Sequence, residues 1–103
     1  MRASALAMAL LLCAGCAHHQ PQLVTPADFA LLTRSGCVYT AELRGNFDQA
    51  LRASGLSTDY QFIDLDTLPK SDVRRGYPTP TLLFKGHDIF GLPVPVPPLP
   101  EPT

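Results

Sequence analysis

The sequence is short of the features that mark several large functional classes. Its 103 residues carry eight Lys and Arg against nine Asp and Glu, so it lacks the basic excess that binds nucleic acid or anionic lipid. No Ser–His–Asp set, Gly-rich phosphate loop or paired-carboxylate motif stands out, and no internal repeat is visible. Tryptophan is absent, and cysteine occurs only three times. We therefore expect no nucleic-acid partner, and the three cysteines become the most informative residues.

Residues 1–15 predict export from the cell. Arg2 gives a positive start, residues 3–12 are almost all apolar, and the small residues Ala14 and Gly15 follow. This is the layout of a secretory signal peptide, and its apolar run is far too short to span a membrane as a helix. We therefore expect these residues to be removed from the mature protein.

The string LLCAGC, which ends at Cys16, resembles the lipobox of bacterial lipoproteins. In that family a peptidase cuts just before a cysteine that carries lipid. Leucine usually stands three residues before the cut, where this chain has Cys13, whereas the two small residues that follow match well. The resemblance implies diacylation of Cys16 and a membrane anchor through its lipid chains. Ala17, in place of the aspartate that often retains such proteins in the inner membrane, implies an outer-membrane protein of the bacterial cell envelope that faces the periplasm.

Cysteine usage then singles out one thiol. If Cys13 leaves with the signal peptide and Cys16 carries lipid, Cys37 is the remaining cysteine, and the mature chain can form no internal disulfide. An odd thiol in an exported protein indicates an intermolecular partner or a reactive group. The alternative is that Cys37 is a small buried hydrophobe, as free cysteines often are.

Two proline-punctuated segments flank the part of the chain that can fold. Residues 16–27 are polar and predict a flexible tether. Residues 93–103, PVPVPPLPEPT, have proline at six of eleven positions. This composition favours an extended polyproline II path and predicts a stiff, exposed tail, although its PxxP spacing could also serve a recognition groove. Residues 28–92 remain for one small domain.

The first half of this domain predicts a strand followed by a helix. The short apolar run at residues 29–32 is typical of a strand. Over residues 38–54 the apolar positions recur at helical spacing, which predicts an amphipathic helix. Gly55 fits the position just past the end of such a helix.

The second half predicts three more strands. Residues 60–65 form a run too short for another helix, and a strand after a helix favours parallel pairing with the first strand. Residues 71–75 predict one helical turn with Ser71 as its cap. Residues 81–90 read as a hairpin hinged at Gly86. The order is β-α-β, a short helical link, then β-β, which is an α/β pattern.

This order, a cysteine just before the first helix and the string TPT just before the hairpin together resemble the thioredoxin-like fold of thioredoxins and glutaredoxins. Cys37 in GCVYT matches the nucleophilic cysteine of the family's CxxC motif, and Thr40 stands where the second, resolving cysteine would be. Pro80 matches the proline with a cis peptide bond at the start of the family's third strand. The resemblance implies that the backbone of Thr79 pairs with an extended substrate segment.

The match to this family is incomplete in three places. The chain has no second active-site cysteine and no tryptophan before Cys37, and the family's final helix has no counterpart after Phe90. We therefore expect a small, C-terminally trimmed thioredoxin-like domain; the alternative is that this chain is a truncated version of a longer one. Pro80 also has an alternative interpretation, as an ordinary trans turn residue.

The resemblance implies redox chemistry at Cys37. A thiolate, not a thiol, attacks disulfides, and a helix N-terminus lowers the pKa of a thiol. Thr40 could donate a hydrogen bond to the thiolate but cannot resolve a mixed disulfide. We expect monothiol thiol–disulfide exchange with a protein or small-molecule thiol or disulfide as partner. The alternative is a non-catalytic module that binds peptides in the same groove, and the exposure of Cys37 distinguishes the two.

The other candidate residues give weaker evidence for a metal site or a catalytic site. Four residues could be assembled into a soft-metal site: His18, His19, Cys37 and His87. Their spacing matches no usual zinc pattern, so we expect no metal and no other cofactor. Asp64 and Asp66 predict the end of a strand rather than a catalytic pair, and Arg74 and Arg75 predict a solvated turn.

Overall fold

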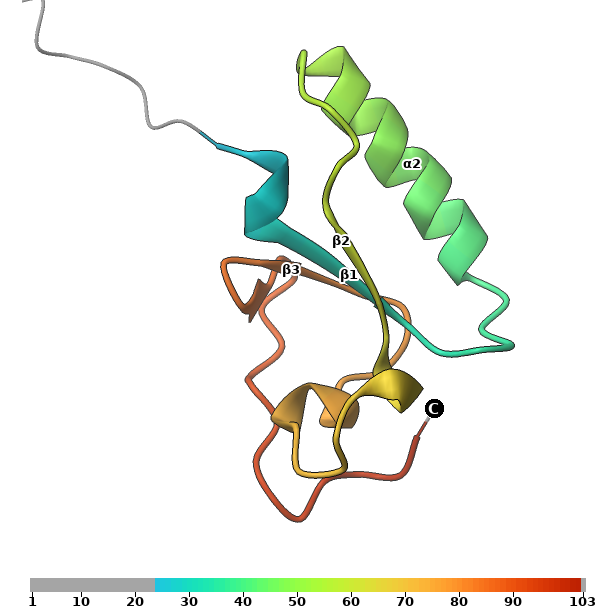
Figure 1. The fold of residues 1–103 in the computed structure, drawn as a ribbon, viewed down its shortest axis with the longest axis vertical. Helices are drawn as coiled ribbons and strands as arrows, with labels where there is room; N and C mark the ends of the chain where they lie inside the picture. The colour runs from blue at the N-terminus through green and yellow to red at the C-terminus, as the bar shows by residue number, and fades with distance from the viewer. Residues whose placement is uncertain (1–23, 103) are drawn as a thin grey trace, which may run out of the picture.

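The computed structural model describes residues 24–102 of the chain. These residues form a domain built on a four-stranded mixed sheet (Figure 1). Its strands are β1 (Phe29–Thr33), β2 (Gln61–Asp64), β3 (Thr81–Phe84) and β4 (His87–Asp88). Their order across the sheet is β2-β1-β3-β4, with β1 and β2 parallel and the other pairings antiparallel. The structure thus confirms the α/β class, the parallel strand–helix–strand unit and the hairpin that the sequence predicts.

Helix α2 (Thr40–Ala53) connects β1 to β2 and packs on one face of the sheet (Figure 1). The ring of Phe47 on the helix meets that of Phe29 on β1, with centroids 4.9 Å apart. The helix begins at Thr40 rather than at Val38 as predicted, because the chain needs the turns before it to leave the end of β1. It ends at Ala53, one residue before the predicted end, and Gly55 just past the end adopts a φ of +74° that a residue with a side chain rarely takes.

The opposite face of the sheet is covered by two short 3-10 helices, η2 (Leu65–Thr67) and η3 (Val73–Gly76). The core on this side consists of Leu32, Leu65, Tyr77 and Leu83. The helical turn predicted at residues 71–75 is present as η3, which begins at Val73, and its cap is Asp72 rather than Ser71. The carboxylate of Asp72 accepts a hydrogen bond from the backbone N–H of Arg74, which is the bond a capping side chain makes.

The two arginines predicted to form a solvated turn instead hold this connection together. Arg75 donates from Nη1 to the carbonyl oxygens of Leu65, at 2.9 Å, and Leu68, at 3.1 Å. Arg74 donates from Nη2 to a carboxylate oxygen of Asp72 at 2.7 Å. The guanidinium group of Arg75 thus provides hydrogen-bond donors for backbone carbonyl oxygens of this connection, and that of Arg74 binds the capping carboxylate.

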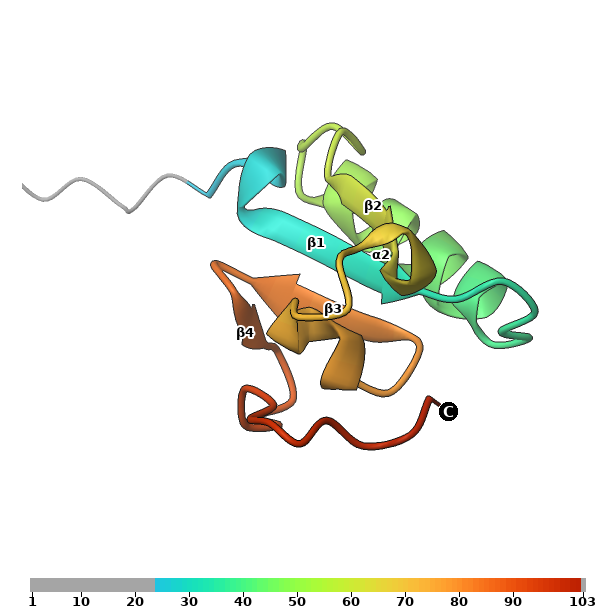
Figure 2. The ribbon, with the colours of Figure 1, turned by 60° about the horizontal axis from the view of Figure 1, so that its bottom comes forward.

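The proline-rich tail does not extend away from the domain as predicted. It turns back across the side of the sheet that carries η3, as both ribbon views show (Figures 1 and 2). Pro95 and Leu99 are half-buried against Gly76, whereas Val96 between them is 73% exposed. The prediction of an exposed tail therefore holds for most of its residues and is wrong for these two.

The amino-terminal predictions are tested only in part. Residues 1–15 and Cys16 lie outside the described residues. At the end of the predicted tether, η1 (Pro26–Asp28) forms a 3-10 turn in which Thr25 N–H donates to Asp28 Oδ2 at 3.1 Å. The described structure therefore includes a turn just before β1 that overlaps the last two residues of the predicted tether.

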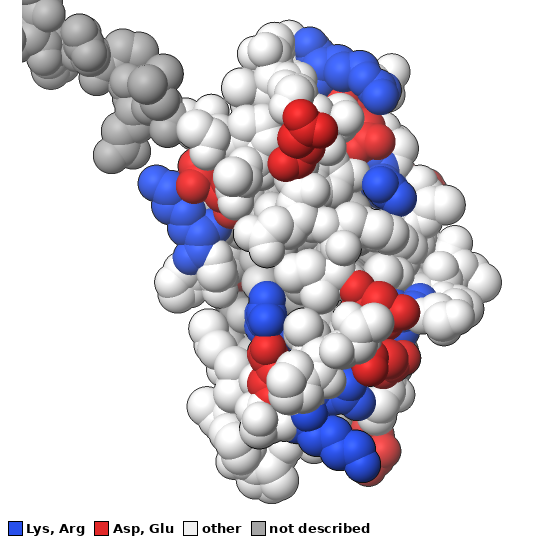
Figure 3. Space-filling view, in the orientation of Figure 1, with Lys and Arg blue, Asp and Glu red and all other residues white. Residues whose placement is uncertain are grey.

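Charged residues of both signs are interspersed on the molecular face seen in Figure 3. Arg and Lys side chains lie beside Asp and Glu rather than forming a broad basic area on that face. This distribution matches the near-balance of charge in the sequence. Within residues 24–102, no helix is both long and apolar enough to cross a membrane.

Candidate functional site

Cys37 lies in the turns between β1 and α2, three positions before the first residue of the helix. Its backbone N–H donates to the carbonyl oxygen of Arg34 at 3.1 Å, and its side chain is partly exposed. Tyr39 is the N-cap of α2 and provides no side-chain hydrogen bond to the helix. The first N–H groups of a helix lack intrahelical acceptors, and those of Tyr39 and Thr40 donate to the Cys37 sulfur. The thiol thus occupies the electrostatic position that the sequence predicts, although it precedes the helix.

A pair of buried threonine hydroxyls lies beneath the sulfur. Thr40, the first residue of α2, donates its hydroxyl hydrogen bond to Cys37. The Oγ1 atoms of Thr40 and Thr33 are 2.7 Å apart, and either hydroxyl can be the donor. The hydroxyl of Thr33 can also donate to the carbonyl oxygen of Arg34, at 3.3 Å; when it donates to Thr40 instead, the hydroxyl hydrogen of Thr40 is available to the sulfur. Thr33 is therefore a positioning residue for Thr40 that the sequence did not single out. Seven positions separate the two residues, and only the strand-to-helix turn brings them together.

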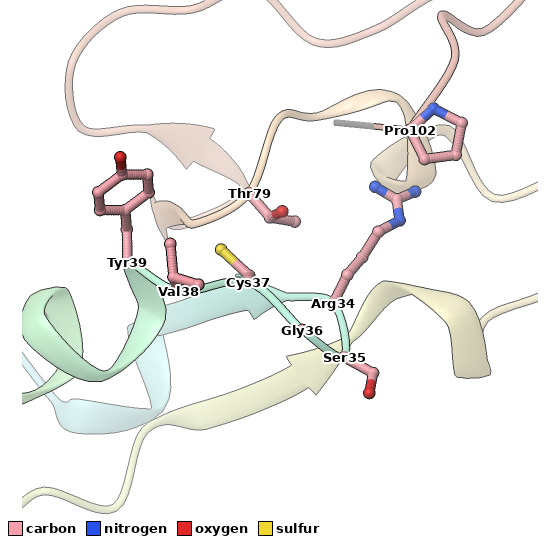
Figure 4. Close-up of a pocket in the computed structure, with 8 residues that line it drawn as sticks. All are labelled: Arg34, Ser35, Gly36, Cys37, Val38, Tyr39, Thr79 and Pro102. Carbon is pink, nitrogen blue, oxygen red and sulfur yellow. The ribbon is translucent and has the colours of Figure 1, made fainter.

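The loop before β3 brings the second predicted element to the thiol. The Cys37 sulfur points toward Thr79 (Figure 4), and the side chain of Thr79 hydrogen-bonds with it. The Thr79–Pro80 peptide bond is cis, as the resemblance implies, and Pro80 immediately precedes β3. The hydroxyl of Thr81 donates to the carbonyl oxygen of Pro78 and ties this loop to the start of the strand. Cys37, Thr40, Thr79 and Pro80 therefore converge in one place.

These contacts hold the pKa of Cys37 below its ordinary value. The hydroxyl of Thr40 makes the largest contribution, because a hydrogen bond to the sulfur favours the thiolate. Partial burial of the sulfur opposes this shift, since desolvation disfavours the charged form. The side chain of Thr79 and the N–H groups of Tyr39 and Thr40 lower the pKa further. The site is therefore built to stabilise a thiolate that solvent can reach.

A cavity of about 340 Å³ opens in front of the sulfur. Its lining is formed by Arg34, Ser35, Gly36, Cys37, Val38, Tyr39, Thr79 and Pro102 (Figure 4). Val38 and Tyr39 are 78% and 67% exposed, although such side chains are more often partly covered. The cavity therefore combines an accessible sulfur with an apolar rim, and the proline tail reaches its edge at Pro102.

Arg34 is a second residue of this site that the sequence did not single out. It directly follows β1, and its side chain is buried, with only 8% exposed. Nε donates to Asp66 Oδ1 at 3.2 Å, and Nη2 donates to the carbonyl oxygen of Arg75 at 2.8 Å. Nη1 is also buried and has no hydrogen-bond partner among the described residues. Its only signal in the sequence is a basic residue at the end of an apolar strand, which is too common to identify a site.

The remaining candidates that the structure describes do not join the site. His87 lies on β4 and lines a different cavity, and His18 and His19 lie outside the described residues. Within residues 24–102, no group of three or more His, Cys, Asp or Glu side chains is arranged to hold a metal ion. Asp64 caps η2 by accepting from the N–H of Asp66, so the pair forms the end of the strand region as predicted.

Comparisons with known proteins identify no family for this chain. A scan against protein-family models and searches among curated proteins and solved structures find no match to this chain.

Proposed function

We propose that this chain is a membrane-anchored, extracytoplasmic protein whose thioredoxin-like domain performs monothiol thiol–disulfide exchange through Cys37. One observation carries the proposal. The partly exposed sulfur of Cys37 has a lowered pKa and faces Thr79, the residue before a cis proline. A structural cysteine of a core is buried and its pKa is raised, which is the opposite of what this site provides.

The arrangement of the elements supports the thioredoxin-like assignment. The nucleophile precedes the first α-helix, and the cis proline immediately precedes β3, the strand next to β1 in the sheet. The family's final helix is missing from the described residues, where the chain after β4 continues into the proline tail. The trimmed form that the sequence predicts is therefore the form we propose.

The reaction begins with a disulfide on the partner. The Cys37 thiolate attacks one sulfur of the partner's S–S bond, a new bond forms between Cys37 and that sulfur, and the other sulfur leaves as a thiolate that takes a proton from water. A second, external thiol, acting as its thiolate, then attacks the mixed disulfide on the partner's sulfur. Cys37 leaves as a thiolate, the partner is now joined to the external thiol, and the number of S–S bonds is unchanged.

Thr40 has a different role from the cysteine whose position it occupies. Its hydroxyl can hydrogen-bond to the leaving or attacking Cys37 thiolate, but it has no sulfur with which to resolve a mixed disulfide. The second step therefore depends on an external thiol. Mixed disulfides should persist whenever such a thiol is absent.

The pH dependence of alkylation tests the proposal. We expect the rate of Cys37 with iodoacetamide to level off at a lower pH than that of a free thiol, whose pKa is about 8.5. Thr40→Val should shift the curve to higher pH and lower the rate at neutral pH by a factor of about two to ten, because one hydrogen bond contributes about 0.5–1.5 kcal/mol. Thr58→Val, in the connection between α2 and β2, is the matched control and should leave the curve unchanged. A Cys37 that reacts only after unfolding would contradict the proposal.

The same pKa shift has a defined consequence for stability. Because the folded state lowers the pKa of Cys37, ionisation of the thiol favours folding. This contribution is fully present above the unfolded pKa of about 8.5, and it is lost as the pH falls through the folded value. Wild type should therefore gain stability relative to Cys37→Ser as the pH rises through this window.

A non-catalytic binding module is the second candidate function. The exposed side chains of Val38 and Tyr39 on the cavity rim favour it, because exposed apolar groups beside a groove are suited to contact a peptide. Such a module would bind an extended segment along Thr79 without any covalent step. It becomes the better proposal if Cys37 proves unreactive in the folded protein.

The anchor is tested separately, because Cys16 lies outside the described residues. We expect Cys16→Ser to leave the protein unprocessed or to release it from the membrane fraction, since the acyl chains provide the attachment. Cys13→Ser is the matched control and should leave the protein anchored, because Cys13 departs with the signal peptide. Cell fractionation followed by mass spectrometry of the mature protein measures both. An unmodified Cys16 in the mature protein would refute the lipid anchor.

A further inference from the structure

We infer that the proline-rich tail, residues 93–102, is an internal ligand of the surface beside Cys37 and that it restricts the access of large partners to the thiol. The tail-binding surface consists of Gly76 on η3 together with Arg34, Lys70 and Arg75. The effect on partners rests on the proposed function. The docking of the tail does not, and it is measured independently below.

A close contact at Gly76 fixes the middle of the tail. A Cβ atom built on Gly76 would lie 2.6 Å from Cβ of Pro95 and 3.1 Å from Cδ2 of Leu99. Gly45 on α2, by contrast, has open space where its Cβ would be. Pro95 and Leu99 therefore contact the backbone of Gly76, and this contact is possible only because Gly76 has no side chain.

Two residues of the tail are partly buried, and the residues between them are exposed. Pro95 and Leu99 are half-buried, whereas Val96 is 73% exposed. The Pro97–Pro98 peptide bond between the two contacts is cis, so the docked tail is not a continuous polyproline II helix. Proline restricts φ at six of the ten positions 93–102, so this segment has less conformational entropy to lose on binding than a flexible chain. Two modest apolar contacts can therefore hold it, although the same contacts would be too weak for a flexible segment.

The last residues of the tail lie beside basic side chains. Glu101 lines a cavity of about 450 Å³ together with three basic residues, Arg34, Lys70 and Arg75. Charged pairs that solvent reaches add little to affinity, but they favour one register over others. The acidic end of the tail therefore lies where this surface offers positive charge.

With Pro95 and Leu99 against Gly76, Pro102 lies beside the thiol of Cys37. Pro102 lines the cavity in front of Cys37, and the guanidinium of Arg34 points toward it (Figure 4). Thr79, whose backbone would pair with an extended substrate, lines the same cavity. A long partner segment that enters this end of the cavity must displace residues near Pro102. Its apparent affinity is then reduced by the fraction of molecules in which the tail is docked.

Gly76→Ala tests the docking itself. The backbone of Gly76 does not require a left-handed conformation, so alanine acts through the tail contact rather than through strain. We expect this variant to raise the rate of Cys37 modification by a polyethylene glycol maleimide by about threefold or more, because the docked fraction falls. Gly45→Ala is the matched control and should not change this rate. An unchanged rate in Gly76→Ala, with the fold intact by circular dichroism, would overturn the inference.

A second variant detaches the tail without touching the domain. Pro95→Ser combined with Leu99→Ser removes both half-buried contacts and should raise the rate with the large maleimide to the same extent as Gly76→Ala. Val96→Ser changes an exposed side chain between them and should have no effect. Adding Gly76→Ala to the Pro95→Ser, Leu99→Ser variant should produce no further increase. A further increase would show that Gly76 acts on something other than the tail, and would overturn the inference.

The size of the reagent separates this inference from the proposed function. Iodoacetamide is small enough to pass the tail, so its rate reports the thiolate, whereas the large maleimide also reports access. If the thiolate is absent, both reagents react slowly in every variant, but their ratio still changes when the tail detaches. If the tail is not docked, the ratio is the same in every variant whatever the pKa of Cys37. The two proposals therefore fail in different measurements.

Discussion

Replacing Cys37 with serine is expected to abolish every reductant-sensitive complex that the protein forms. Wild type, isolated without reductant, should give higher-mass bands that disappear when a thiol is added, because Thr40 cannot resolve a mixed disulfide. Cys37→Ser removes the attacking sulfur and should reduce these bands to background. Non-reducing electrophoresis of protein purified from the cell measures the difference directly.

Thr40→Cys is the complementary change. It places a second sulfur three positions after the first and close to it, since the hydroxyl of Thr40 already hydrogen-bonds to Cys37. The new thiol should attack the mixed disulfide, form an internal disulfide with Cys37 and release the partner. The higher-mass bands should therefore disappear in this variant without added reductant. Bands that persist equally in wild type and in Cys37→Ser would refute the exchange proposal.

Leu65→Ala is expected to have the largest effect on stability. Leu65 is fully buried and belongs to the core cluster formed with Leu32, Tyr77 and Leu83. Removing a buried leucine side chain costs about 2–5 kcal/mol, from lost apolar contact and from the cavity that remains. A domain of this size is only marginally stable, so this loss should leave a large fraction of the molecules unfolded at room temperature.

Urea denaturation followed by far-ultraviolet circular dichroism measures this effect. Leu92→Ala is the matched control, because Leu92 is 47% exposed and substitutions at the surface usually change stability by less than about 0.5 kcal/mol. If Leu65→Ala unfolds at the same urea concentration as Leu92→Ala, the 3-10 segment does not cover the core as the structure describes.

The sequence by itself determined the elements whose signals are local. The apolar run before the first turn became β1, the helical periodicity became α2, and Gly55 ended that helix because its conformation suits few other residues. Helix periodicity and turn chemistry depend on neighbours a few positions apart, which a sequence displays directly. Cys37 and Pro80 were identified in the same way, by motifs of a few residues each, and the structure places them at one site.

Three features of the site were decided only by the tertiary structure. Thr33 supports Thr40 across the turn between strand and helix, and Arg34 is buried by its bonds to a carboxylate and a carbonyl more than thirty positions away. The proline tail returned to Gly76 instead of extending into solvent. Its composition favours an extended chain but does not say what that chain lies against. In each case the free energy comes from a pairing between distant segments, and a sequence shows each member of such a pair without showing that they meet.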